Sequence, residues 1–137
     1  MNRKKIYLSG PILGCNKKEA REWRLNTIFE LKNQYDFINP ATKLYKKEAD
    51  HFEEVVEFAE KGVEECDIIL AYIPFYSMGT SIEICWAYEK NKKILVVLEN
   101  DEVSAFLKKY SDKIFKNLEE AYQYLGSGYN EQYINVN

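Results

Sequence analysis

Hydrophobic and polar positions along the chain predict strands and helices in regular alternation. Residues 67–73 and 93–98 are almost continuously apolar, which is typical of strands buried on both faces of a parallel sheet. Weaker strand patterns cover residues 4–9, 35–39 and 113–116. Apolar residues recur at helical spacing over residues 17–33, 48–66, 80–91, 102–110 and 117–125.

This alternation predicts right-handed crossovers between parallel strands, with helices on both faces of one sheet. We expect an α/β fold, a flavodoxin-like three-layer sandwich with a five-stranded parallel sheet in the order 2-1-3-4-5. That order places the turns at 9–14 and 74–80 opposite each other, at the switch point of the sheet. The length of 137 residues predicts one domain over residues 1–125, followed by a tail over 126–137.

Composition and charge exclude several classes of function. The net charge of −3 provides no basic field for nucleic acid, and no apolar run approaches the ~18 residues that cross a membrane. Three cysteines without a CxxC pair argue against a disulfide framework, so we expect a cytoplasmic protein. The single histidine, His51, has no nucleophile nearby in sequence, and no zinc spacing is present. We therefore expect chemistry without a metal or cofactor, carried by carboxylates and hydroxyls.

Glu83 is the most informative candidate residue, because it follows the apolar strand at 67–73 and a Pro/Ser/Gly turn. Two interpretations are open. Thr80-x-x-Glu83 matches a capping box, in which the carboxylate returns a hydrogen bond to the helix backbone. Alternatively, the carboxylate faces a ligand at the switch point, where a helix N-terminus favours the ionised form that a nucleophile requires.

The first strand and its turn offer a second group of candidates. Tyr7 and Ser9 share one face of the strand, and Ile6 and Leu8 share the other. Tyr7 is either a core residue or a hydroxyl that reaches the neighbouring carboxylate. The turn at 9–14 is either a plain turn or a phosphate cradle of backbone N–H groups, from which Pro11 removes one donor.

Three ordered motifs resemble those of the nucleoside 2-deoxyribosyltransferase superfamily, including its nucleotide N-glycosidase branch. They are Ile6-Tyr-Leu-Ser-Gly-Pro-Ile12, Ile38-Asn-Pro-Ala-Thr42, and Asp67-Ile-Ile-Leu-Ala-Tyr-Ile-Pro74 with Ser77-Met-Gly-Thr-Ser-Ile-Glu-Ile-Cys-Trp-Ala-Tyr88. The resemblance implies that Glu83 attacks C1′ of a (deoxy)ribosyl group, giving a glycosyl-enzyme intermediate that water or a second base resolves. It also implies that Tyr7 orients Glu83.

The resemblance further implies which residues contact a small-molecule nucleoside or its 5′-monophosphate. Ser77 and Ser104 favour the monophosphate, because a carboxylate at position 77 would repel a phosphate. Members are usually homodimers or larger homo-oligomers, in which Ser104 and the tail help to complete a neighbour's pocket. The implied substrate-binding residues are Ser9, Gly10, Pro11, Ile12, Ser77, Gly79, Thr80 and Ser104.

Three positions depart from the pattern of the resemblance and keep other functions open. Pro11 and Leu13 stand where nucleotide hydrolases carry Ser and Arg, and Ala59 stands where many members carry an Asp that assists the leaving base. One alternative is a nucleotide-binding module with little or no turnover. Another is an NAD glycohydrolase, because nicotinamide leaves without help from that acid.

Overall fold

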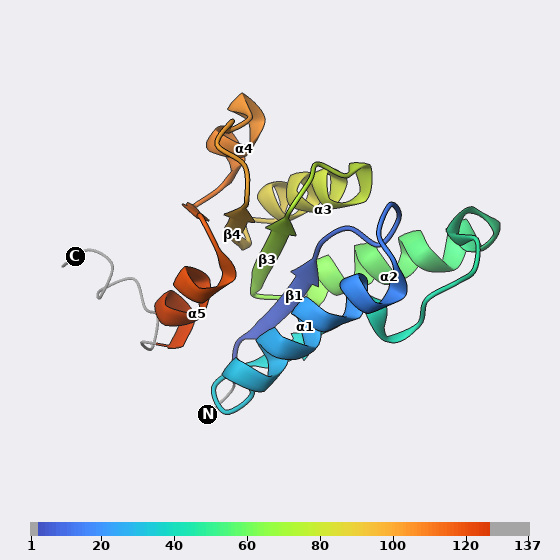
Figure 1. The fold of residues 1–137 in the computed structure, drawn as a ribbon, viewed down its shortest axis with the longest axis horizontal. Coiled ribbons are helices and arrows are strands. Elements are labelled where there is room, and N and C mark those ends of the chain that lie inside the picture. Colours follow the sequence, from blue (N-terminus) through green and yellow to red (C-terminus); the bar gives the residue numbers. More distant parts are fainter. Residues whose placement is uncertain (1–2, 127–137) are drawn as a thin grey trace.

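The computed structural model describes residues 3–126, and these build a five-stranded sheet in the order β2-β1-β3-β4-β5 (Figure 1). Every neighbouring pair of strands is parallel, which confirms the predicted order. The strands are β1 (Lys5–Ser9), β2 (Asp36–Ile38), β3 (Ile68–Ile73), β4 (Lys93–Leu98) and β5 (Lys113–Phe115).

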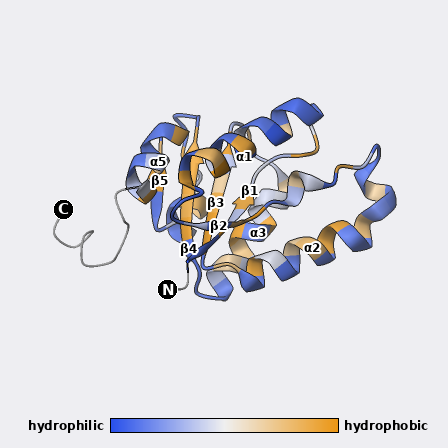
Figure 2. Cartoon of the chain, turned by 90° about the horizontal axis from the view of Figure 1, so that it is seen from below, coloured by the Kyte–Doolittle hydropathy of each residue, from blue (hydrophilic) through white to orange (hydrophobic). Residues whose placement is uncertain are grey.

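Helices cover both faces of the sheet and complete three layers. The first face packs against α1 and α5, and the second against α2, α3 and α4. Figure 2 shows the hydrophobic strands between these helices. The helices are α1 (Lys17–Leu31), α2 (Phe52–Glu65), α3 (Met78–Glu89), α4 (Ala105–Tyr110) and α5 (Leu118–Gly126), with short 3-10 helices at Pro40–Thr42 and Glu48–His51. Within residues 3–126 no helix is both long and apolar enough to cross a membrane.

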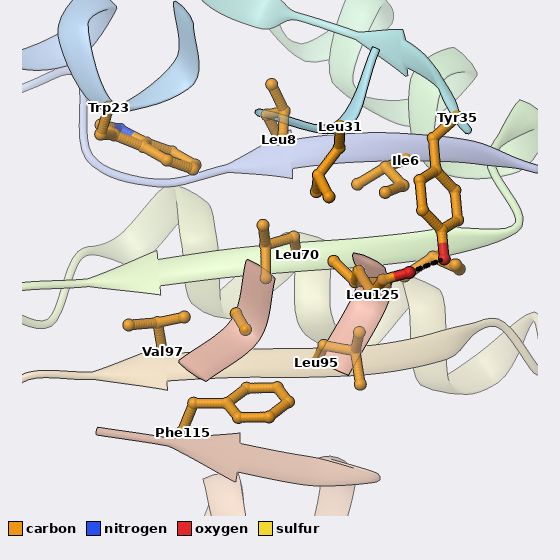
Figure 3. Close-up of a cluster of buried hydrophobic side chains, with 12 residues drawn as sticks. Ile6, Leu8, Trp23, Leu31, Tyr35, Leu70, Leu95, Val97, Phe115 and Leu125 are labelled. Atoms are coloured by element: carbon orange, nitrogen blue, oxygen red, sulfur yellow. Dashed lines mark hydrogen bonds between the residues drawn. The ribbon is translucent and has the colours of Figure 1, made fainter. Parts of the chain in front are cut away.

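The first face of the sheet holds an apolar cluster built from alternate residues of the central strands. Ile6, Leu70 and Leu95 point from β1, β3 and β4 toward the residues of α1 and α5 (Figure 3). Tyr35 places its ring in this cluster and donates its hydroxyl to the carbonyl oxygen of Leu125 at 2.7 Å. The bond ties the start of β2 to the end of α5, and so closes this layer.

The second face carries the residues from which the candidate site is built. Tyr7 lies there, fully buried, in a cluster with Ile69, Val96 and Val63 of α2. Ile6 and Leu8 lie on the first face, so the predicted alternation along β1 is confirmed. Tyr7 is thus a core residue, and its hydroxyl lies at the side where α3 packs.

The helix predicted over residues 48–66 is two elements, a 3-10 turn at Glu48–His51 and then α2. Two residues of its predicted buried stripe are largely exposed, Phe52 at 62% and Val56 at 43%. The first half of α2 extends past the sheet in Figure 1, so no strand covers its apolar side. The expectation of one continuous buried face is therefore wrong for this half of the helix. The tail was predicted to begin at Gly126, which instead ends α5; residues 127–137, with Tyr129 and Tyr133, fall outside the described residues.

Candidate active site

Glu83 lies beside a cavity of about 740 Å³ at the carboxyl ends of β1 and β3. The turns predicted to face each other both line it: residues 10–14 after β1 and residues 75–80 after β3. The third wall comes from the segment between β2 and α2 together with the first half of α2. This is the switch point of the sheet, where open α/β folds bind ligands.

Both carboxylate oxygens of Glu83 accept hydrogen bonds from β1. The Tyr7 hydroxyl donates to Oε2 at 2.5 Å, and the Ser9 hydroxyl donates to Oε1 at 2.6 Å. Such short bonds are typical of a charged acceptor, and they fix the carboxylate in one orientation. The strand alternation explains the pair, because residues 7 and 9 point to the same face.

The start of α3 decides between the two interpretations of Glu83. Ser77 is the N-cap: its Oγ accepts from the Thr80 N–H at 3.4 Å and lies 2.8 Å from the Thr80 hydroxyl. The helix begins at Met78, so Glu83 lies in its second turn, too far along to return a bond to the cap. The capping-box interpretation is therefore wrong, and the carboxylate instead accepts the hydrogen bonds of Tyr7 and Ser9 beside the cavity.

Opposing effects set the protonation of Glu83. Burial raises the pKa of its carboxyl, while the hydrogen bonds from Ser9 and Tyr7 and the charge of Arg24 lower it; the charge of Glu48 raises it further. Burial, followed by the charge of Glu83, also raises the pKa of Tyr7 far above its ordinary value. Tyr7 therefore stays protonated and acts as a permanent donor to the carboxylate.

Arg24 is a buried cation behind this pair, and the sequence analysis did not identify it. Its side chain is fully buried, and its three nitrogens donate to carbonyl oxygens of Leu8 at 3.2 Å, Ala20 at 2.6 Å and Gly10 at 2.9 Å. Two of these carbonyls flank Ser9, so the guanidinium fixes the end of β1 that holds Glu83. The sequence did carry a signal for its burial, because residues 20, 24 and 27 share one face of a helix, and Ala20 and Thr27 on that face are buried.

Residues 3–101 match the family model described as nucleoside 2-deoxyribosyltransferase like. The chain belongs to this family. Comparison with curated proteins found no match to the sequence.

Solved structures show the same fold for this nucleoside 2-deoxyribosyltransferase-like chain. A CMP N-glycosidase from Clostridium botulinum is 22% identical, with a TM-score of 0.63 over 90% of this chain and 98% of that one. A 2-deoxyribosyltransferase from Bacillus psychrosaccharolyticus is 15% identical, with a TM-score of 0.71 over 93% of each chain. A conserved protein from Enterococcus faecalis V583 is 15% identical, with a TM-score of 0.65 over 92% of this chain and 99% of that one. The flavodoxin-like prediction is confirmed.

The predicted substrate-binding residues of this nucleoside 2-deoxyribosyltransferase-like chain fall into two groups. Five of them line the cavity: Gly10, Ile12, Ser77, Gly79 and Thr80. The other three do not line it. Ser9 is buried and holds Glu83, and Pro11 is buried in the turn. Ser104 caps α4: its Oγ accepts from the Phe106 N–H at 3.2 Å, and its own N–H donates to the Tyr76 hydroxyl at 3.2 Å.

The third wall of the cavity adds charged residues that sequence reasoning did not identify. Glu54 accepts the Tyr45 hydroxyl at 2.7 Å and lies 3.7 Å from the Lys43 ammonium. Glu48, in the 3-10 turn before α2, also lines the cavity, as does Ala59. The helical pattern over residues 48–66 placed Glu48 and Glu54 in one predicted helix, and no sequence signal directed either carboxylate to the site.

Proposed function

We propose that this protein cleaves the N-glycosidic bond of a (deoxy)nucleoside or its 5′-monophosphate, with Glu83 as the nucleophile. One observation carries the proposal: a carboxylate held at both oxygens by Tyr7 and Ser9, beside a cavity at the switch point of the sheet. The family match supports the same class of chemistry. Either water or a second base accepts the sugar, so the class includes hydrolysis and transfer.

The reaction divides into two displacements at C1′. In the first, a carboxylate oxygen of Glu83 bonds to C1′ as the bond from C1′ to the base nitrogen breaks. In the second, water or another base bonds to C1′ and Glu83 leaves as a carboxylate. Tyr7 and Ser9 hold the nucleophile in place before substrate arrives, which removes an ordering cost from the first step.

The residues around the cavity include some that favour a 5′-phosphate on the substrate and some that disfavour it. Ser77 lines the cavity where a carboxylate would repel a phosphate, which favours a monophosphate. However, the described lining holds three carboxylates, Glu48, Glu54 and Glu83, and Lys43 is its one Lys or Arg. Each nucleoside is therefore tested beside its own 5′-monophosphate, and the ratio of the two rates reports whether the cavity prefers the phosphate.

The test is release of free base, measured by chromatography, from a panel of ribo- and deoxyribonucleosides and their 5′-monophosphates. We expect release by wild type, loss of release in Glu83→Ala, and wild-type release in Glu53→Gln, a change at an exposed α2 residue outside the cavity lining. A 2′-fluoro substrate slows breakdown of the intermediate, so mass spectrometry should find the sugar on the peptide that contains Glu83. Equal release by wild type and Glu83→Ala from every member of the panel refutes the proposal. Saturable nucleotide binding without release supports a binding module in its place.

A further inference from the structure

The departing base needs a proton in most nucleosides, because breaking the bond to C1′ leaves negative charge on the base. The position that resembles an assisting acid is Ala59, which lines the cavity and has no proton to give. If the proposed function holds, another group at the cavity must serve. The described titratable residues of the lining are Tyr7, Lys43, Tyr45, Glu48, Glu54, Tyr76 and Glu83.

Most of these groups are already engaged by other residues. Tyr7 donates to Glu83, and Tyr76 donates to the carbonyl oxygen of Glu102 at 3.0 Å. On the third wall Glu54 is occupied on one oxygen, Oε2, which accepts from Tyr45 and lies near Lys43.

Glu48 differs from all of them. Among residues 3–126 its side chain forms no hydrogen bond and no ion pair, although it is half-buried and lines the same cavity as Glu83. It comes from the 3-10 turn before α2, beyond the carboxyl end of β1 in Figure 1, whereas Glu83 comes from α3. The two carboxyl groups thus reach the same cavity from different elements, an arrangement that can place a nucleophile and an acid on either side of a scissile bond.

We propose that Glu48 is the acid that assists departure of the base. In the first displacement its carboxyl proton moves to the base as the bond from C1′ to nitrogen breaks and the bond from C1′ to Glu83 forms. In the second displacement the Glu48 carboxylate takes the proton from the attacking water, or from the incoming base, as the bond to Glu83 breaks. Each turnover therefore returns both side chains to their starting states.

Electrostatics provides independent support that the two carboxyl groups share one site. The charge of Glu48 adds to the raised pKa of Glu83, after the larger effect of burial. This effect requires proximity across the cavity.

The experiment compares two series of substrates that differ in what the leaving group requires. The first series is the nucleosides or monophosphates that wild type cleaves, whose bases leave with a proton. The second is nicotinamide riboside and 4-nitrophenyl riboside, whose leaving groups depart without one. For Glu48→Gln we expect kcat/KM to fall by about 100- to 10,000-fold on the first series and by less than about threefold on the second. Glu83→Ala should lose activity on both, and Glu53→Gln on neither.

The outcomes separate this inference from the proposed function. Wild type that cleaves neither series overturns both. Active wild type with an unchanged Glu48→Gln, or with equal losses on the two series, overturns the role of Glu48 alone. A leaving-group-dependent loss in Glu54→Gln instead would assign the acid to Glu54 and also overturn it. Glu48→Asp should recover part of the activity on the first series, and thermal unfolding of each variant shows that a loss of rate is not a loss of fold.

Discussion

Replacing Arg24 by Met tests whether a buried cation supports the nucleophile or only the fold. The guanidinium is fully buried, lies 4.7 Å from the centre of the Trp23 ring, and donates to three carbonyl oxygens, those of Leu8, Gly10 and Ala20. Arg24→Met removes the charge and all three donors while keeping an unbranched stem of similar length. Arg21→Met, at an exposed position on the same helix, is the matched control.

The expected loss of stability follows from two opposing contributions. Burial lowers the pKa of Arg24 well below its ordinary value, to about 10, so holding the charge in the folded state costs about 3 kcal/mol. Each of the three hydrogen bonds from the charged group stabilises the fold by about 1.5–3 kcal/mol. The stabilisation lost with these hydrogen bonds exceeds the cost of burying the charge, which the variant no longer bears. The free energy of unfolding of Arg24→Met, measured by urea denaturation, should therefore be about 3 kcal/mol lower than that of wild type.

Arg24→Met should also change the pH dependence of catalysis. The positive charge of Arg24 lowers the pKa of Glu83, so its removal raises that pKa. A nucleophilic carboxylate must be ionised, and the acidic limb of the pH profile of kcat/KM should therefore move to higher pH in Arg24→Met. The other groups that act on Glu83 are Tyr7, Ser9 and Glu48, and all three are unchanged in the variant.

Two results would refute this reasoning about Arg24. A loss of stability with an unmoved acidic limb would show that the guanidinium only ties β1 to α1. A variant as stable as Arg21→Met would show that the three hydrogen bonds do not stabilise the fold. Arg24→Lys adds a third comparison: it keeps the charge but not the fork of donors, so the limb should stay near its wild-type position while stability falls.

Two further predictions concern the stability of the site. Burial raises the pKa of Glu83, so the folded state binds its proton more tightly than the unfolded chain, and wild-type stability falls as pH rises from about 4 through the folded-state pKa. Glu83→Gln should therefore be more stable than wild type by about 1–2 kcal/mol at about pH 7 in urea unfolding, and an equal gain at about pH 4 would contradict this cause. In Gly62→Ala the new Cβ would lie 2.6 Å from Cε2 of the buried Tyr7 ring, so we expect a loss of about 1–3 kcal/mol together with a lower kcat/KM. Gly79→Ala, whose Cβ meets nothing within 4 Å, is the control for stability, and equal stability of the two alanine variants would contradict the clash.

The fold was predictable because its strongest signals depend on burial alone. The strands at 67–73 and 93–98 lie at the centre of the sheet, where both faces are covered, so their sequences are apolar or aromatic after the first residue of each. The prediction of burial failed in the first half of α2 because a cavity wall and a core require the same apolar residues. Its apolar residues predicted a buried helix, but Phe52 and Val56 are exposed, and Val56 lies in the wall of the cavity together with Val55, Phe58 and Ala59. An apolar stripe indicates removal from water in some state of the protein, and a ligand cavity produces the same pattern as a core.

The candidate site was predictable only where the backbone itself brings residues together. Parallel pairing aligns Tyr7 with Ile69 and Ser9 with Ala71, so the end of β1 must lie beside the turn that leads to Glu83. The start of α3 then depends on a choice that local sequence leaves open, because Ser77 and Thr80 are both good caps. Capping by Ser77 places Glu83 in the second turn, on the side of α3 that faces β1. Had Thr80 been the cap, the same carboxylate would have been used by the helix backbone. Capping by the Ser77 hydroxyl thus leaves the Glu83 carboxylate to accept the hydrogen bonds of Tyr7 and Ser9 beside the cavity.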